Sequence, residues 1–159
     1  MTVELDLPDE ASTIALGVAL AGVFEVPLLV GLTGDLGAGK TTLVRALINA
    51  EAPGTRVKSP TYTLVESYTL PRAQLHHLDL YRLRDADELA GLGIDELLAG
   101  DAIVLVEWPE RGAPLLPMPD LLIALAHRDR GRSARISAST DRGTALLARL
   151  PEALATAFD

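Results

Sequence analysis

Cysteine is absent from this chain of 159 residues. Its absence excludes disulfides, zinc sites with thiolate ligands, iron–sulfur clusters and cysteine nucleophiles, and it fits a reducing cytoplasm. The sequence also lacks a basic N-terminal region followed by an apolar stretch, and no segment is apolar over the length of a membrane span. We therefore expect a soluble cytoplasmic protein that does not enter a membrane.

Positive charge is also scarce, with 14 basic against 22 acidic residues and a net charge of −8. Binding of nucleic acid depends largely on basic side chains that neutralise phosphates. An acidic chain is a poor candidate to hold DNA or RNA by itself, so any link to nucleic acid has to run through another protein. The dinucleotide fingerprint G-x-G-x-x-G is missing as well, which disfavours an oxidoreductase.

Hydrophobic residues make up 48% of the chain. This content is sufficient to form the core of one globular domain, which we expect over residues 1–159. Residues 34–42 fit G-x-x-x-x-G-K-[ST], the phosphate-binding loop. An apolar run at 28–32 precedes this segment and a helical pattern at 42–48 follows it, so the context is strand, loop, helix. The alternative, a glycine-rich turn with a solvated lysine, does not account for both flanks.

Each residue type in this loop meets a requirement of phosphate binding. The glycines allow backbone N–H groups to form a concavity, and the helix that follows adds the positive end of its dipole. Lys40 supplies a cation for the β- and γ-phosphates, and Thr41 offers a hydroxyl to Mg²⁺. The residues expected around the nucleotide are Asp35, Leu36, Gly37, Ala38, Gly39, Lys40, Thr41 and Thr42.

Two acidic residues end apolar runs that read as strands. Glu107 follows the continuous apolar run 102–106, which is typical of a parallel strand buried on both faces, and it is predicted to bind Mg²⁺ or orient water. Asp79 falls at the C-terminal end of the strand expected at 74–79 and could hold Mg²⁺ or a bound water, with a structural carboxylate bonded to a loop as the alternative. Thr61 is a candidate sensor of the γ-phosphate, or part of an ordinary Ser-Pro-Thr turn.

Other parts of the chain carry weaker indications. Strands are expected at 3–7, 63–68, 120–126 and 135–139, and the helix at 144–158 is expected to be interrupted at Pro151. Asp9 should cap a helix that has Ile14, Val18 and Ala21 on one face.

The adjacent His76 and His77 point to opposite faces of a strand, so we interpret both as structural. The arginines of 128–135 could cover a nucleotide, dock on a partner or sit in a solvated hairpin tip.

Several stretches together resemble the TsaE (YjeE) family, the ATPase component of bacterial tRNA N6-threonylcarbamoyladenosine biosynthesis. They are residues 34–42, 58–65, 79–83, 105–109 and 131–135, and their order along nearly the whole chain is more specific than the phosphate loop alone.

The resemblance implies a three-layer α/β fold of the P-loop NTPase type, with a mixed, largely parallel central sheet and helices on both faces. It implies binding of ATP or ADP with Mg²⁺, and action with the partner proteins TsaB and TsaD on tRNA that is reached through the complex. TsaD would transfer the threonylcarbamoyl group while the ATPase resets the complex between turnovers.

The resemblance also implies roles for single residues. Lys40 and Thr41 serve the phosphates and Mg²⁺, and Thr61, Asp79 and Glu107 line the metal and hydrolysis site, with Lys40, Glu107 and Asp79 as its catalytic residues. Trp108 closes over that site and Arg132 meets the nucleotide, while Glu10 and Thr13 lie near the expected place of the base.

Two other functions are compatible with a phosphate loop. A small-molecule kinase would transfer the γ-phosphoryl group to an acceptor, and the arginines of 128–135 could serve as its lid. A binding module would use ATP only as a conformational ligand, and a catalytic Glu107 would argue against that function.

Overall fold

The computed structural model describes residues 1–158. Strands and helices alternate along most of this chain, as an α/β protein requires. The elements, in chain order, are β1 (Thr2–Leu7), α1 (Glu10–Val23), β2 (Leu28–Thr33), α2 (Lys40–Glu51), β3 (Val65–Thr69), β4 (Gln74–Asp79), α3 (Ala86–Gly91), α4 (Ile94–Ala99), β5 (Ala102–Glu107), the 3₁₀ turn η1 (Pro109–Gly112), β6 (Leu121–Arg128), β7 (Gly131–Ala138) and α5 (Asp141–Ala157).

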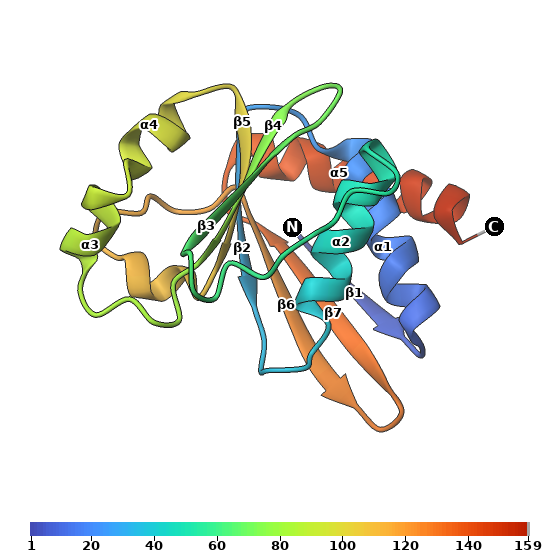
Figure 1. Cartoon of the computed structure of the whole chain (residues 1–159). Helices are drawn as coiled ribbons and strands as arrows, with labels where there is room; N and C mark the ends of the chain where they lie inside the picture. Colours follow the sequence, from blue (N-terminus) through green and yellow to red (C-terminus); the bar gives the residue numbers. More distant parts are fainter. Residues whose placement is uncertain (159) are drawn as a thin grey trace.

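The strands form one mixed sheet of order β1-β7-β6-β2-β5-β4-β3. Its four central strands, β6, β2, β5 and β4, run parallel, while β3 and the β7–β1 pair add antiparallel margins (Figure 1). The expected mixed α/β sheet with a parallel centre is confirmed. Because parallel strands end at the same edge, the segments that follow β2, β4 and β5 come together there.

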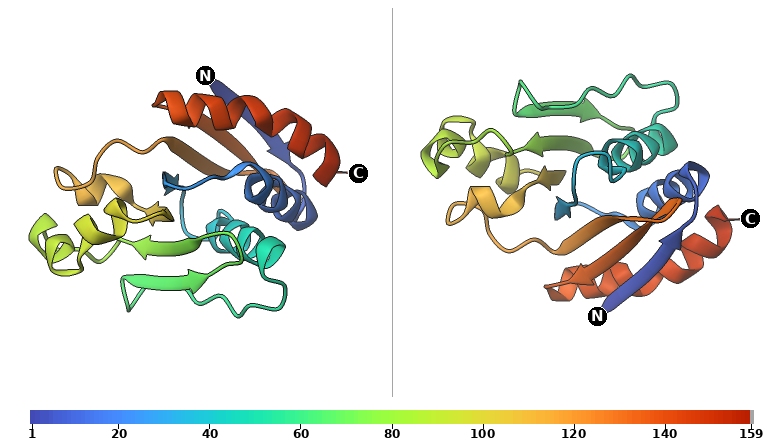
Figure 2. Two further views of the ribbon diagram at one scale, coloured as in Figure 1. Left: turned by 90° about the horizontal axis from the view of Figure 1, so that it is seen from above. Right: turned by 90° about the horizontal axis from the view of Figure 1, so that it is seen from below.

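Helices cover both faces of the central sheet (Figure 2). The larger core joins one face of β2, through Leu28, Val30 and Leu32, to α1 and α2, and it also includes α5. The smaller core joins the other face, through Leu29, to α3 and α4. This arrangement explains why β2 and β5 are continuous apolar runs rather than alternating ones.

Helix α1 packs against both α2 and α5, and this changes which of its sides is buried. Ile14 and Val18, which the sequence pattern placed with Ala21 on one apolar face, are 42% and 41% exposed. Ser12 and Thr13 are buried instead. The expectation for Ile14 and Val18 was wrong because the buried side of α1 carries Leu16, Gly17 and Leu20 instead, whereas Ala21 is buried as expected.

Gly17 is where α1 comes closest to α2. A Cβ atom at Gly17 would lie 2.6 Å from the Cβ of Ala46 and 2.8 Å from the carbonyl oxygen of Leu43. We expect Gly17→Ala to lower the free energy of unfolding by about 1–3 kcal/mol through overpacking, although alanine favours helix. Gly22→Ala in the same helix is the control: no atom lies within 4 Å of a Cβ there, so this change should stabilise by about 0.5–1 kcal/mol. Urea unfolding of both variants checks the prediction, and equal stabilities would contradict it.

Three further boundaries differ from the sequence expectations. Helix α5 continues through Pro151, because Leu146, Leu147 and Leu150 anchor it to the core and the proline itself is exposed. The arginines of 128–135 lie mainly in the strands β6 and β7 rather than in a loop. Strand β3 begins at Val65, after Leu64 takes a positive φ of 66°.

None of the described helices is both long and apolar enough to cross a membrane.

Candidate active site

A hollow of about 360 Å³ lies where β2, β4 and β5 end, beside the loop that joins β2 to α2. It brings together most of the residues that the sequence analysis proposed. Those that line it are Leu36, Gly37, Gly39, Lys40, Thr41, Thr42, Thr61, Asp79, Glu107, Trp108 and Arg132. Asp35 and Ala38 belong to the same loop but do not line the hollow; the N–H of Ala38 donates to the carbonyl of Asp35 at 3.0 Å.

The backbone of the loop depends on glycine. Gly34 has a φ of 143°, and a Cβ there would lie 2.4 Å from the carbonyl oxygen of Leu125. Gly39 has a φ of 105° and precedes the first turn of α2. Within residues 1–158, no side chain caps this helix N-terminus, so its first N–H groups are available to an anion.

Lys40 and Glu107 form an ion pair in this hollow. The Nζ atom of Lys40 lies 3.6 Å from Oε1 of Glu107 and donates a hydrogen bond of 2.6 Å to the carbonyl oxygen of Gly34. Both charged residues are buried, at 8% and 5% exposure. A buried lysine and glutamate are retained only when they are paired. The pair therefore presents both charges at the end of β5, next to the loop.

The carboxylate of Glu107 has a second partner, His77 of the neighbouring strand β4. The Nε2 atom of His77 lies 2.9 Å from Oε2 of Glu107. Burial alone would raise the pKa of Glu107, but the hydrogen bond and charge of His77, followed by those of Lys40, outweigh burial and lower this pKa. Glu107 is therefore a carboxylate at neutral pH.

Asp79 lies beside Glu107 in the register of the parallel strands β4 and β5. Its Oδ1 atom accepts a hydrogen bond of 3.0 Å from the N–H of Tyr81, and the residue is 8% exposed. Asp79 thus has a structural contact in the loop and also lines the hollow, so both interpretations of this residue are compatible with its position. Thr41 is exposed at the start of α2, and Oγ1 of Thr61 is 2.6 Å from Oγ of Ser59.

These oxygen donors suit Mg²⁺ but do not make a complete site by themselves. No group of three or more His, Cys, Asp or Glu side chains within residues 1–158 could hold a metal ion. Mg²⁺ in nucleotide sites is held by one or two carboxylates together with phosphate oxygens and water. The donor set of Thr41, Asp79 and Glu107 therefore fits an ion that arrives with a nucleotide.

Aromatic residues border the hollow. The ring of Trp108 lies 5.1 Å from Nζ of Lys40 and 5.1 Å from the ring of Tyr81, and the guanidinium of Arg111 is near both rings. Trp108 has a φ of 57°, a conformation that costs a non-glycine residue about 1–3 kcal/mol and concentrates at functional sites. The ring of Trp108 thus lies against the Lys40 ammonium at the border of the hollow.

Glu10 and Thr13 lie in an adjoining hollow of about 230 Å³, which shares Gly39, Thr42 and Arg132 with the first. The side chains of Thr13 and Arg132 come close to the glycine-rich loop at Gly39. A Cβ atom at Gly39 would lie 3.7 Å from both Cγ2 of Thr13 and Nε of Arg132. Ser12, by contrast, bonds to the cap residue Asp9, through both its N–H and its hydroxyl.

Sequence reasoning missed four residues of the site. Ser59, Tyr81 and Arg82 line the hollow, and His77 contacts Glu107 beneath it. Ser59 and Tyr81 adjoin proposed residues in the chain, so proximity could have suggested them. The contact of His77 depends on how β4 and β5 pair, which no local pattern specifies.

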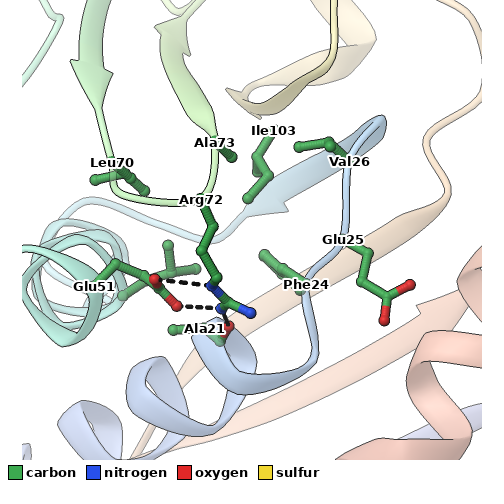
Figure 3. Close-up of a pocket in the computed structure, with 10 residues that line it drawn as sticks. Ala21, Phe24, Glu25, Val26, Glu51, Leu70, Arg72, Ala73 and Ile103 are labelled. Carbon is green, nitrogen blue, oxygen red and sulfur yellow. Dashed lines mark hydrogen bonds and ion pairs between the residues drawn. The ribbon is translucent and has the colours of Figure 1, made fainter.

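A separate cavity of about 230 Å³ lies near the start of β2 and the β3–β4 turn, away from these residues (Figure 3). Its walls are mainly apolar and include Phe24, Leu70 and Ile103. Arg72 crosses its edge, bonding to the carboxylate of Glu51 and donating 3.0 Å to the carbonyl of Ala21. This ion pair links the turn to the last residue of α2, and we assign the cavity no part in the site.

Comparisons with known proteins show which family the chain resembles. The sequence profile of the family described as "Threonylcarbamoyl adenosine biosynthesis protein TsaE" matches residues 7–136. The chain is 41% identical over 142 residues to a tRNA threonylcarbamoyladenosine biosynthesis protein TsaE from Haemophilus influenzae, covering 86% of this chain and 90% of the relative. A protein of the same name from Nostoc sp. is 39% identical over 138 residues, covering 82% and 83% of the two chains.

A solved structure is also similar. The crystal structure of YdiB from Bacillus subtilis superposes with a TM-score of 0.81 at 28% identity, covering 96% of this chain and 95% of that one. The matched family region, residues 7–136, includes the glycine-rich loop, β4, β5 and Arg132, which contribute to the lining of the hollow. The chain therefore belongs to the TsaE family of tRNA threonylcarbamoyladenosine biosynthesis proteins.

Proposed function

We propose that this chain acts as one P-loop ATPase domain of the tRNA threonylcarbamoyladenosine machinery, binding Mg·ATP and hydrolysing it to reset the complex between turnovers. The observation that carries the proposal is the buried pair of Lys40 and Glu107 at the end of β5, beside a glycine-rich loop and an uncapped helix N-terminus. A cation, aligned N–H groups and a carboxylate in one hollow are what hydrolysis of a phosphoanhydride requires.

In this proposal the loop and the start of α2 hold the phosphates. Lys40 leaves the carbonyl of Gly34 and binds the β- and γ-phosphate oxygens, where it offsets the charge that develops on the γ-phosphoryl group. Thr41, Asp79 and Glu107 would hold Mg²⁺, which when bound adds positive charge to the same oxygens. Glu107 orients the attacking water, and Trp108 limits the entry of other water molecules.

Glu10, Thr13 and Arg132 surround the hollow next to the phosphates, so we propose them as contacts to the rest of the nucleotide. The resemblance to the TsaE family supports TsaB and TsaD as partners, with tRNA reached through that complex. The net charge of −8 supports the same indirect route to tRNA.

Phosphate release from Mg·ATP tests this function, measured for the chain alone and then with TsaB and TsaD. Weak activity that rises strongly with both partners is the expected result. Activity that ignores the partners and rises with a small acceptor would contradict the proposal and favour a kinase. A complete lack of hydrolysis in the full complex would leave a nucleotide-binding module.

Trp108 provides a direct signal of binding because it is the single tryptophan of the chain. Its ring faces the ammonium of Lys40, which is expected to move to the phosphates. Addition of ADP should therefore change the tryptophan emission with a saturable dependence on concentration. Lys40→Ala should need about 10- to 100-fold more ADP to reach the same fraction of its emission change. An unchanged concentration dependence in this variant would contradict the assignment of the hollow.

A further inference from the structure

His77 is buried directly below the proposed hydrolysis site. It lies two residues before Asp79 on β4, and both side chains project from the same face of the strand. In the parallel register Asp79 pairs with Glu107, while His77 pairs with Leu105. The side chain of His77 is 1% exposed, and that of Glu107 is 7% exposed. The hydrogen bond between them is therefore shielded from solvent.

The direction of this bond follows from its chemistry. An ionised carboxylate accepts hydrogen bonds and cannot donate them, so Nε2 of His77 carries the hydrogen. His77 holds Oε2 of Glu107, whereas Lys40 faces Oε1 at 3.6 Å. Two partners on two different oxygens set the plane of the carboxylate.

Nucleotide binding affects these two partners differently. Lys40 is the cation that the proposed function assigns to the phosphates, so its contact with Glu107 weakens when nucleotide binds. His77 has no path to the phosphates, because it lies beneath Glu107 in the sheet. After binding, His77 is the partner that continues to fix the orientation of the Glu107 carboxylate.

The other ring nitrogen of His77, Nδ1, is buried and makes no hydrogen bond to the described residues. A buried polar atom without a partner opposes folding and calls for an explanation. A role toward Glu107, the one hydrogen-bond partner of the His77 side chain among the described residues, would account for a polar ring at this buried position.

We infer that His77 is a positioning residue, which orients the Glu107 carboxylate for hydrolysis through its Nε2–H group. This inference rests on the proposed ATPase function. Outer partners of this kind commonly change activity by about 10- to 100-fold when they are removed.

The test compares His77→Leu, which fills the space without a donor, with His77→Gln, which restores an N–H donor. His76→Leu is the matched control, because His76 lies next in the chain, faces the opposite side and bonds to Ser67. Each variant is assayed with TsaB and TsaD for kcat and KM, and alone for the Kd of ADP and for the melting temperature.

His77→Leu should lower kcat by about 10- to 100-fold while KM and the Kd of ADP stay near the parent values. His77→Gln should recover most of the rate, and His76→Leu should match the parent. An unchanged kcat in His77→Leu would overturn the inference. If His77→Leu lowered kcat, the affinity for ADP and the melting temperature together, and His77→Gln restored none of them, the inference would also be overturned. That pattern would indicate a structural role.

A second readout does not depend on hydrolysis. Long-range ¹H–¹⁵N spectra of the three histidines should show His77 protonated at Nε2, with signals that shift in Glu107→Gln while those of His76 and His127 do not. A His77 ring insensitive to Glu107→Gln would overturn the inference even if the parent is an active ATPase. A parent inactive with both partners would instead overturn the proposed function itself.

Discussion

Replacement of Glu107 by glutamine should slow ATP hydrolysis by roughly two to four orders of magnitude, because it removes the carboxylate that we propose orients the attacking water. Glutamine has nearly the same shape and can still accept the hydrogen bond from His77, so the fold should persist. The negative charge beside the phosphates also disappears, and the affinity for ADP should therefore not fall. Phosphate release with TsaB and TsaD and calorimetry with ADP measure the two effects separately.

Glu110→Gln is a suitable control for this experiment. Glu110 lies three residues further on, in the exposed turn η1, and removal of its charge should leave hydrolysis unchanged. If Glu107→Gln hydrolysed ATP at the parent rate, the proposed role of Glu107 would be wrong. Hydrolysis would then have to rely on Asp79, the other buried carboxylate of the hollow.

Lys40→Ala should weaken the binding of ADP and ATP by about 10- to 100-fold, the equivalent of a charged hydrogen bond worth about 1.5–3 kcal/mol. The ammonium of Lys40 is buried and already lies at the loop, so little ordering is needed before it meets a phosphate. Calorimetric titration with ADP, with and without Mg²⁺, measures the loss.

The chain offers one other lysine as a control, the exposed Lys58. Lys58→Ala removes the same charge from the net total and should not change the affinity for ADP. Unchanged affinity in Lys40→Ala would remove the assignment of the glycine-rich loop to phosphate binding. The melting temperature of Lys40→Ala should be measured as well, because this change removes one of the two side-chain partners of Glu107. Among the described side chains, His77 is then the remaining partner of that carboxylate.

These variants together separate binding from hydrolysis. In the proposed function, Lys40 binds the nucleotide in both the ground state and the transition state, whereas Glu107 orients the attacking water and His77 acts through Glu107. The geometry predicts weaker nucleotide binding, measured as a higher Kd, for Lys40→Ala. It predicts a lower kcat with little change in Kd for Glu107→Gln and His77→Leu. The same pattern would distinguish an ATPase from a module that only binds nucleotide.

The sequence by itself determined the features that depend on neighbours in the chain. The glycine-rich loop is recognisable because Gly34 and Gly39 adopt positive φ values that other residues avoid. The apolar run of β5 is recognisable because a central parallel strand is buried on both faces. The acidic residue that ends it, Glu107, follows from the same local pattern.

The tertiary structure alone decided what depends on distant parts of the chain. The pairing of β4 with β5 places His77 under Glu107, 30 residues later. The packing of α1 against α2 and α5 leaves Ile14 and Val18 exposed, because the side of α1 that carries Leu16, Gly17 and Leu20 is the buried one. The packing of α5 against the core carries that helix through Pro151. Local preferences are worth about 1 kcal/mol or less for most residues and about 3 kcal/mol for a proline inside a helix. Burial of several apolar side chains against distant elements contributes more than this, so it decides the structure where the two disagree.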